Sequence, residues 1–249
     1  MPSDSSKRAI FNVSNIIKGG ALQAAVNFIA TSKDAEYQQL DWFYILSKEV
    51  NEELQKSNIT LTHNVLVVND SPTHSQYIKD QILAFEQASS PDIVFTLFGP
   101  CYIKFNCLHV TGFANGWVTH ATFATFNDTF NGKIPTIIKS LLKYCYYAFH
   151  IRQADGWIFE TETAKKGFIK RLKVPNHQCH VVANTSISFG DKFTKVKETT
   201  INNIALNYAD NLFIALAADY PQKNLLSLIT AANHLKHTLQ ESNFKIIFT

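Results

Sequence analysis

The chain has 249 residues, 46% of them hydrophobic and 17% charged, so it is long enough to bury a sizeable core and too apolar for a disordered protein. The formal net charge is +3, and the basic residues are dispersed along the sequence, which argues against a nucleic-acid-binding surface and favours a small anionic ligand. The four cysteines have neither CxxC spacing nor a histidine at zinc-finger distance. We therefore expect reduced thiols and no metal site.

The N-terminal stretch MPSDSSKRAIFNVSN lacks the long apolar core of a secretory signal, which predicts a cytoplasmic protein. One long apolar segment, residues 134–151, contains Lys139 and Lys143 and is shorter than a comfortable membrane span. We expect this segment to form a buried or interfacial helix, and the protein to make at most peripheral contact with the inner face of a membrane.

Short apolar runs alternate with helical stretches along the whole chain. Runs rich in Val, Ile and Phe are typical of parallel strands covered on both faces: AIFNV, WFYIL, NVLVV, DIVFTLF, GWIFE, HVVAN, LFIALA and KIIF. The expected helices cover residues 21–30, 47–56, 74–89, 134–152, 161–172 and 223–241. This alternation predicts an α/β fold, with a Rossmann-like domain built on a parallel sheet.

A polar segment, SFGDKFTKVKETT, has little strand or helix periodicity and is the best candidate for a linker. It divides the chain into an N-terminal domain at 1–190, a linker at 191–203 and the start of a second Rossmann-like domain at 204–249. A complete domain of this kind would continue for about 100 residues more. The second domain is therefore expected to be incomplete.

Two glycines, Gly19 and Gly20, lie between the first predicted strand and the first predicted helix. Glycine lets backbone N–H groups approach a ligand closely, and a helix N-terminus favours an anion. The spacing matches neither the dinucleotide fingerprint nor the P-loop. The two glycines therefore either bind a phosphate or only make the turn.

The segment GPCYIKFNCLHVTGFANGWVTHA follows the strand DIVFTLF and is expected to be a loop outside the carboxyl end of that strand, where open α/β sheets bind ligands. His109 is the candidate for proton transfer or for hydrogen bonding to a sugar hydroxyl, and Phe113 and Trp117 are candidates for an apolar wall. The alternative is a histidine satisfied inside a packed loop. His120 is expected to be a bystander.

The segment ADGWIFETETAKKGFIKRL predicts a strand followed by a helix. Thr161 is expected to cap this helix, with Glu162 in its positive first turn, so both are assigned structural roles. The basic residues of the helix are expected to form a solvated face, with anionic lipid or phosphate as the alternative partner: Lys165, Lys166, Lys170 and Arg171.

Near the C-terminus, Lys223 in the element PQKN follows a strand where a helix begins, so it either joins the helix dipole in binding a phosphate or is a surface residue. In order, the Gly-Gly loop, the GFANGW loop, the ADGWIFETETAKKGF block, the VVAN turn and PQKN resemble the retaining glycosyltransferases of family 4, which have the GT-B fold of two facing Rossmann-like domains. The resemblance covers most of the chain through short motifs whose order is more telling than any single one.

The resemblance implies a role for each candidate residue. Gly19 and Gly20 would face the diphosphate of a nucleoside diphosphate sugar, Lys223 would grip that diphosphate, and His109 would lie near the transferred sugar. The implied partners are the nucleotide sugar and a glycan or lipid-linked acceptor. No metal and no further cofactor are implied, because positive side chains and a helix dipole would stabilise the leaving group.

The chain departs from the family pattern in two places. The family commonly has an arginine shortly before the lysine, where this chain has Ala218. The paired glutamates seven residues apart, which in the family hold the ribose and orient the sugar, would lie beyond Thr249. The expected function is a retaining glycosyltransferase of cell-surface polysaccharide or glycoconjugate synthesis that is inactive alone.

Two alternatives belong to other functional classes. The chain could be a noncatalytic binding module, or a remnant completed by a separately encoded C-terminal domain. A nicotinamide-dependent oxidoreductase is disfavoured, because no candidate strand is followed by the three-glycine fingerprint.

Overall fold

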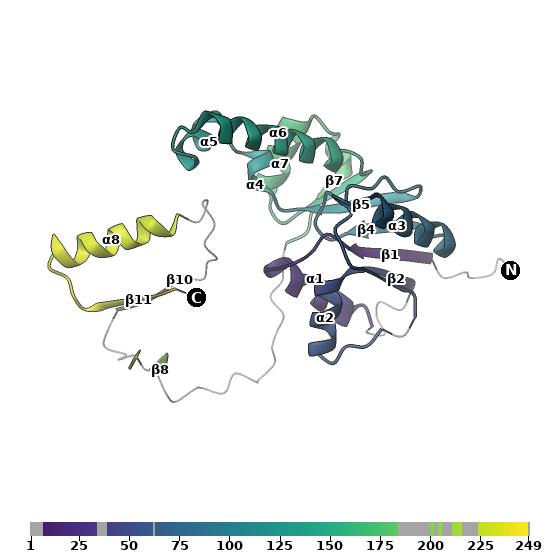
Figure 1. Cartoon of the computed structure of the whole chain (residues 1–249), viewed down its shortest axis with the longest axis horizontal. Coiled ribbons are helices and arrows are strands. Elements are labelled where there is room, and N and C mark those ends of the chain that lie inside the picture. Colours follow the sequence, from purple (N-terminus) through teal and green to yellow (C-terminus); the bar gives the residue numbers. More distant parts are fainter. Residues whose placement is uncertain are drawn as a thin grey trace. The chain divides into compact units, whose positions relative to one another are not determined.

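Figure 1 shows the computed structural model, which describes residues 7–33, 39–61, 63–183, 200–201, 204–205, 211–215 and 224–248. The chain divides into two compact units. The first comprises Met1–Asn127 and Gly132–Asn184, and the second comprises Asp128–Asn131 and Thr185–Thr249. The described residues form one sheet in the first unit and two short sheets in the second, and each unit is described by itself below.

The first unit is built on a seven-stranded, wholly parallel sheet with the strand order β3-β2-β1-β4-β5-β6-β7. Its strands are β1 (Lys7–Val13), β2 (Leu40–Ser47), β3 (Val65–Val68), β4 (Ile93–Thr96), β5 (Leu108–Phe113), β6 (Gly156–Phe159) and β7 (Cys179–Val181). The predicted α/β class with a parallel sheet is confirmed. The order runs outward from β1 in both directions, which places the topological switch point between β1 and β4.

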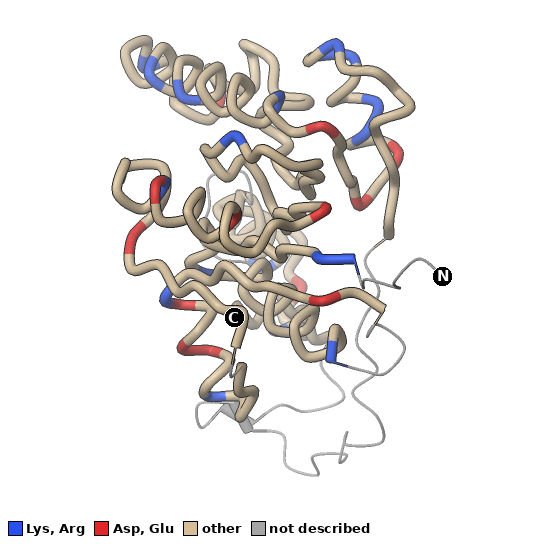
Figure 2. Tube along the Cα trace, turned by 90° about the vertical axis from the view of Figure 1, so that its right-hand side faces the viewer, with Lys and Arg blue, Asp and Glu red and all other residues tan. Residues whose placement is uncertain are grey.

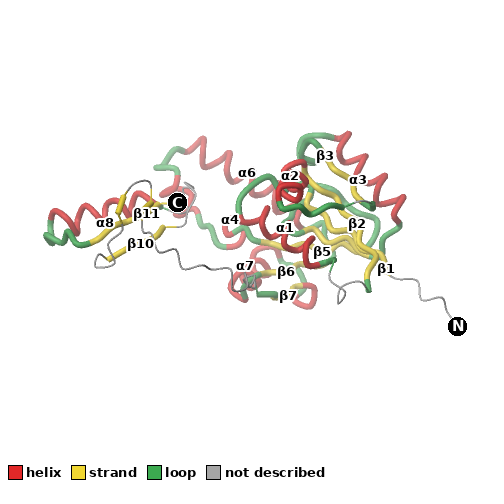
Figure 3. Tube along the Cα trace, turned by 90° about the horizontal axis from the view of Figure 1, so that it is seen from below, coloured by secondary structure: helices red, strands yellow, loops and turns green. Residues whose placement is uncertain are grey.

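Helices cover both faces of this sheet (Figure 3). The helices described within residues 7–183 are α1 (Gly20–Thr31), α2 (Lys48–Lys56), α3 (Gln76–Ser89), α4 (Gly116–Thr119), α5 (Phe123–Thr129), α6 (Ile134–Ile151) and α7 (Glu162–Leu172), with a 3-10 turn at Asn176–Gln178. The helices predicted within residues 21–172 are confirmed to within a few residues at each end, while the short α4 and α5 were not predicted from the sequence.

Alternation along the strands explains why both faces are apolar. In β1, Phe11 packs with residues of α1 and α2, whereas its neighbour Ile10 packs with Ile78 and Ile82 of α3. A third core lies between β5, β6 and α7, where the ring of Phe168 is fully buried. Successive strand residues point to opposite faces, so a sheet covered on both sides needs apolar residues at nearly every position.

The expectation of a loop over residues 99–121 is wrong at its centre, where Leu108–Phe113 forms β5. The sequence LHVTGF contains two polar residues, His109 and Thr111, and was therefore not recognised as a buried strand. Both side chains are buried, and His109 is hydrogen-bonded to Thr96 of the neighbouring β4. A polar residue is tolerated in a buried strand when a neighbouring strand supplies its partner.

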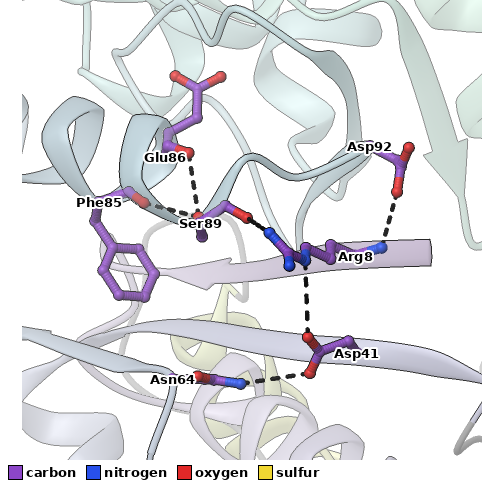
Figure 4. Close-up of polar contacts among 7 residues, drawn as sticks. All are labelled: Arg8, Asp41, Asn64, Phe85, Glu86, Ser89 and Asp92. Carbon is purple, nitrogen blue, oxygen red and sulfur yellow. Dashed lines mark hydrogen bonds and ion pairs between the residues drawn. The ribbon is translucent and has the colours of Figure 1, made fainter. Parts of the chain in front are cut away.

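Carboxylates fasten the amino edge of the sheet, where the strands begin. Asp92, just before β4, accepts a hydrogen bond from the Arg8 N–H at 2.8 Å and donates its own N–H to the Arg8 carbonyl at 2.9 Å. The Arg8 side chain donates to the Ser89 carbonyl at the end of α3 and lies 4.0 Å from Asp41 of β2 (Figure 4). Three elements are thereby joined at the start of β1.

The described part of the second unit contains a short antiparallel pair, β8 (Thr200–Ile201) with β9 (Ile204–Ala205), and a β-α-β element. In that element β10 (Asn211–Ala215) pairs in parallel with β11 (Phe244–Phe248), and α8 (Leu225–His237) lies between them in sequence. A parallel β-α-β element agrees with the predicted Rossmann-like start, and the boundaries 190 and 204 remain predictions. Among the residues described, no helix is both long and apolar enough to cross a bilayer.

Candidate functional site

The N-terminus of α1 lies at the carboxyl edge of the sheet, at the switch point. Gly19 is its N-cap, with φ 77° and ψ −159°, and Gly20 is its first residue. The first N–H groups of a helix have no partner within the helix, and the first turn of α1 contains no acidic residue. A Cβ added to either glycine would meet no atom within 4 Å. The end of α1 therefore faces open space, as an anion site requires.

The loop after β1 is tied to the loop after β4. Asn15 donates from Nδ2 to the carbonyls of Phe98 at 2.7 Å and Pro100 at 3.0 Å, across the switch point. The peptide bond between Gly99 and Pro100 is cis. The Asn15 Oδ1 and Ser14 Oγ atoms are buried without a hydrogen-bond partner among the described residues. The two hydrogen bonds of Asn15 thus hold the loop after β1 against the loop after β4.

The loop after β5 closes the third side of this edge. Asn115 caps α4 by accepting a hydrogen bond from the Trp117 N–H at 3.0 Å. The half-buried indole of Trp117 stacks on Tyr144 of α6, with ring centroids 5.8 Å apart and 12° between the planes. Burial raises the pKa of the Tyr147 phenol, which stays protonated and donates to the Gly99 carbonyl. The loops after β4 and β5 are thus both braced by α6.

The three loops at the centre of this edge contain no carboxylate. Residues 14–20, 97–100 and 114–117 read SNIIKGG, LFGP and ANGW, with Lys18 their only charged residue. Asparagine amides and backbone N–H groups carry no negative charge and can donate hydrogen bonds to an anion, whereas a carboxylate would repel it. The edge is therefore suited to a phosphate or another anion. Among the described residues, no group of three or more His, Cys, Asp or Glu side chains could hold a metal ion.

His109 lies elsewhere, near the start of β5, with 4% of its surface exposed. Its Nε2 is 2.9 Å from Thr96 Oγ1, its ring packs edge-on against Phe105, and its N–H donates to Asp155 at 2.9 Å. Burial lowers the pKa of His109 to about 4 and raises that of the Cys101 thiol, 3.9 Å away, to about 11. Both groups are neutral near pH 7, so they form no reactive thiolate–imidazolium pair.

The other predicted site residues are distributed as follows. Phe113 is 2% exposed and packs against Phe168 at 4.7 Å between centroids, so the expected apolar wall is part of the core at this position. Trp117 lies at the carboxyl edge, as do Gly19 and Gly20. Lys223 falls outside the described residues. The structure therefore brings both glycines and the Trp117 loop to one edge of the sheet, and places His109 and Phe113 in the interior.

Thr161 and Glu162 have the structural roles assigned to them, because Thr161 caps α7 by accepting from the Ala164 N–H at 3.2 Å. The sequence reasoning missed Asn15 and Asn115 as site residues. Their signal was present, since each asparagine closely follows a buried strand, but asparagine is common in every kind of turn. Only the bonds that the two side chains make distinguish them.

A cavity of about 300 Å³ lies at the opposite, amino side of the sheet. Its wall includes Lys33, Asp41, Trp42, Tyr44 and Asn64. The carboxyl edge remains the better candidate, because ligands of open α/β sheets bind there.

No protein-family model matches the sequence, and no curated protein does. Solved structures do resemble the fold. One, from Listeria monocytogenes and described as a UDP-N-acetylglucosamine 2-epimerase, is 12% identical with a TM-score of 0.56 over 98% of this chain and 62% of its own. The lipopolysaccharide outer core galactosyltransferase WaaB is 11% identical, with a TM-score of 0.52 over 97% of this chain and 60% of its own.

A third similar structure is the UDP-GlcNAc 2-epimerase from Neisseria meningitidis bound to UDP-GlcNAc, 10% identical, with a TM-score of 0.50 over 97% of this chain and 64% of its own. The chain thus spans less than two thirds of the length of these structures. At such identities the likeness establishes the architecture and no reaction. The chain has an α/β fold of the GT-B type.

Proposed function

We propose that the chain belongs to a nucleotide-sugar-dependent GT-B enzyme, and that the carboxyl edge at the β1–β4 switch point contacts the diphosphate of the sugar donor. The observation that carries this proposal is the open N-terminus of α1 at Gly19 and Gly20, set among three loops without a carboxylate. Backbone N–H groups and the helix dipole would stabilise the negative charge of the leaving diphosphate.

The finer proposal is a retaining glycosyltransferase that serves cell-surface polysaccharide or glycoconjugate synthesis, with a glycan or lipid-linked acceptor. WaaB, a galactosyltransferase, supports this choice, as does the order of motifs from the Gly-Gly loop to PQKN. In this proposal Lys223 adds its ammonium to the diphosphate site. His109 would act by positioning, through Thr96 and β5, because its ring is buried and neutral.

A UDP-sugar 2-epimerase is the second candidate, favoured by the epimerases among the similar structures. Both reactions use the same donor class, so they differ in product rather than in the diphosphate site. Incubation with UDP-N-acetylglucosamine separates them: an epimerase changes the configuration at C2 of the sugar, whereas a transferase releases UDP only when an acceptor is present.

Transfer also requires groups that orient the sugar, and the 249 residues contain no pair of glutamates seven apart. We therefore expect these 249 residues to bind a nucleotide, and transfer to need further groups that orient the sugar. If the chain is instead a noncatalytic binding module, it either does not bind a nucleotide or binds one without any second chain that restores transfer. A split enzyme regains transfer when the two chains are mixed, and a binding module does not.

The test of the site uses the amide resonances of Gly19 and Gly20 in the full chain, titrated with UDP. We expect both to shift, and Gly20→Asp to weaken binding at least tenfold, because a carboxylate would lie within a few ångströms of the diphosphate. An acidic residue in the first turn favours the helix, so this variant should remain folded. Gly20→Asn is the matched neutral control and should bind UDP like the unmodified chain. Equal UDP binding by the Gly20→Asp variant would refute the proposed site.

A further inference from the structure

Helix α6, at the top of Figure 1, is apolar on two opposite faces. One face is packed into the first unit through the fully buried Ile137 and Ile151 and the half-buried Tyr144, Tyr147 and Ala148. The residues of the other face are all exposed: Ile134, Ile138, Leu141, Leu142, Cys145, Tyr146 and Phe149. A helix on a protein surface normally presents polar residues there.

The exposed apolar side chains are neighbours on the helix and form one continuous surface. At 3.6 residues per turn they share an arc of about 140° that runs the length of the helix. Leu142 is 66% exposed and Phe149 is 65% exposed, so the surface includes large side chains at both its middle and its end. Contiguous apolar surface of this kind marks an interaction site.

The charges of α6 have a single sign. Residues 134–151 contain no Asp or Glu. The exposed Lys139 and Lys143 lie beside the apolar arc, at the border formed by Tyr146. The exposed Lys133 precedes the helix. Figure 2 marks the lysines and arginines of the described residues in blue along the backbone. On α6, these basic residues adjoin a continuous apolar surface.

We propose that the outward face of α6 docks on an anionic bilayer, with the helix axis in the plane of the membrane. An apolar arc bordered by lysines suits this position, because the side chains enter the headgroup region while the ammonium groups meet anionic lipid. A second copy of the chain fits less well, since its own α6 would bring no acidic residue to these lysines.

The docking helix also contacts loops of the candidate site. Tyr146 stacks on Tyr102 of the loop after β4, with centroids 5.8 Å apart, and its neighbour Tyr147 donates to the Gly99 carbonyl. The same helix therefore has one face toward the bilayer and direct contacts to the carboxyl-edge loops. A lipid-linked substrate would then enter from the membrane side. The docking proposal itself does not depend on the proposed reaction.

The test is flotation of the full chain with vesicles of equimolar phosphatidylcholine and phosphatidylglycerol, compared with vesicles of phosphatidylcholine alone. We expect binding to the anionic vesicles and at least a tenfold loss in the double variant Leu142→Ser, Phe149→Ser. The matched control is Tyr77→Ser on α3, which changes an equally exposed ring, 69% exposed, outside the arc. This control should bind like the unmodified chain.

The charge component has its own pair of variants. Replacing Lys139 and Lys143 by glutamine should weaken binding to anionic vesicles about fivefold per lysine. Replacing Lys166 and Lys170 of α7 by glutamine should leave binding unchanged. If the α7 pair has the larger effect, the basic face of α7 is the lipid contact and the proposal is wrong.

A fluorescent label on the exposed Cys145, in a Cys107→Ser background, reports on insertion. We expect a blue shift on vesicle addition and quenching by lipids that carry a spin label in the acyl chain. Far-ultraviolet circular dichroism of each variant confirms that it is folded. Failure of the folded, unmodified chain to float would overturn the proposal, as would a self-associating chain that the Leu142→Ser, Phe149→Ser variant converts to monomers without any vesicle binding.

Discussion

The two edges of the seven-stranded sheet are built from different chemistry. At the amino edge, Asp92 and Asp155 each precede a strand, accept a backbone N–H from the neighbouring strand and return their own N–H to a carbonyl of that strand. Glu86 adds three hydrogen bonds to the segment entering β5. At the carboxyl edge, the central loops after β1, β4 and β5 contain glycines and asparagines and no carboxylate.

This difference agrees with the proposal that an anion binds at the carboxyl edge. The strands begin with unpaired N–H groups, and at β1 and β5 carboxylates of the protein satisfy some of them. At the carboxyl edge the N-terminus of α1 remains open, and a carboxylate nearby would compete with an anionic ligand. The carboxylates at the amino edge thus stabilise the fold, whereas the open N-terminus of α1 is at the carboxyl edge.

The largest effect is expected where the carboxyl edge itself is tightly packed. A Cβ on Gly112 would overlap the carbonyl oxygen of Leu97, which is backbone and cannot rotate away. Gly112→Ala should therefore lower the free energy of unfolding by about 4 kcal/mol. Urea denaturation measures it, with Gly116→Ala as control because its added Cβ meets no atom within 4 Å. An unchanged free energy of unfolding in Gly112→Ala would mean that β4 and β5 can move apart at little energetic cost.

The next effect tests the fastening of the amino edge. Glu86 is 3% exposed and accepts hydrogen bonds from the Asn106 N–H, the Asn106 amide and the Cys107 N–H. Glu86→Ala would leave these donors unpaired and should cost about 3 kcal/mol of unfolding free energy. Glu86→Gln retains one acceptor and should cost less. UDP binding should be unchanged in Glu86→Gln, and a parallel loss of binding would contradict the separation of the two edges.

His109 gives the stability of the first unit a pH dependence. Its pKa is lowered from 6.5 to about 4 in the folded chain by burial, so the unfolded chain binds the proton first as the pH falls. The stability due to the neutral imidazole is complete above about pH 6.5 and is lost toward about pH 4. Between about pH 7 and about pH 5 the loss should be about 2 kcal/mol. Urea midpoints at both pH values should differ less in His109→Gln, and an equal difference would show that other groups cause it.

The smallest effect compares the two neighbouring glycines. Gly19 has φ 77° and ψ −159°, a conformation that side chains strongly disfavour, while Gly20 is an ordinary helical position. Gly19→Ala should destabilise the chain by about 1 kcal/mol, and Gly20→Ala should be neutral or slightly stabilising. Thermal unfolding measures both. Equal stabilities would mean that the loop relaxes without cost, which would weaken the case for a preformed anion site.

Much of the fold could be predicted because its signals are local. Runs such as WFYIL and DIVFTLF are apolar at successive positions, which only a strand covered on both faces explains, and the helices of the first unit follow from their periodicity and caps. The strand β5 could not be predicted, because His109 and Thr111 interrupt its apolar pattern and their buried environment comes from β4 and the segment at 100–107. Of the site, the glycines of the first loop were identified, whereas Asn15 and Asn115 were not.

The sequence by itself determined the α/β class, the parallel sheet, the helix caps and the strand-to-helix position of Gly19 and Gly20, since each depends on residues a few positions apart. Only the tertiary structure decided which residues share an edge. It placed His109 and Phe113 in the core, brought Asn15 to the loop after β4, and left one face of α6 exposed. The physical reason is that burial and hydrogen bonding depend on residues that are far apart in the sequence. Asn15 and Phe98, for example, are 83 positions apart, and no local pattern encodes such a contact.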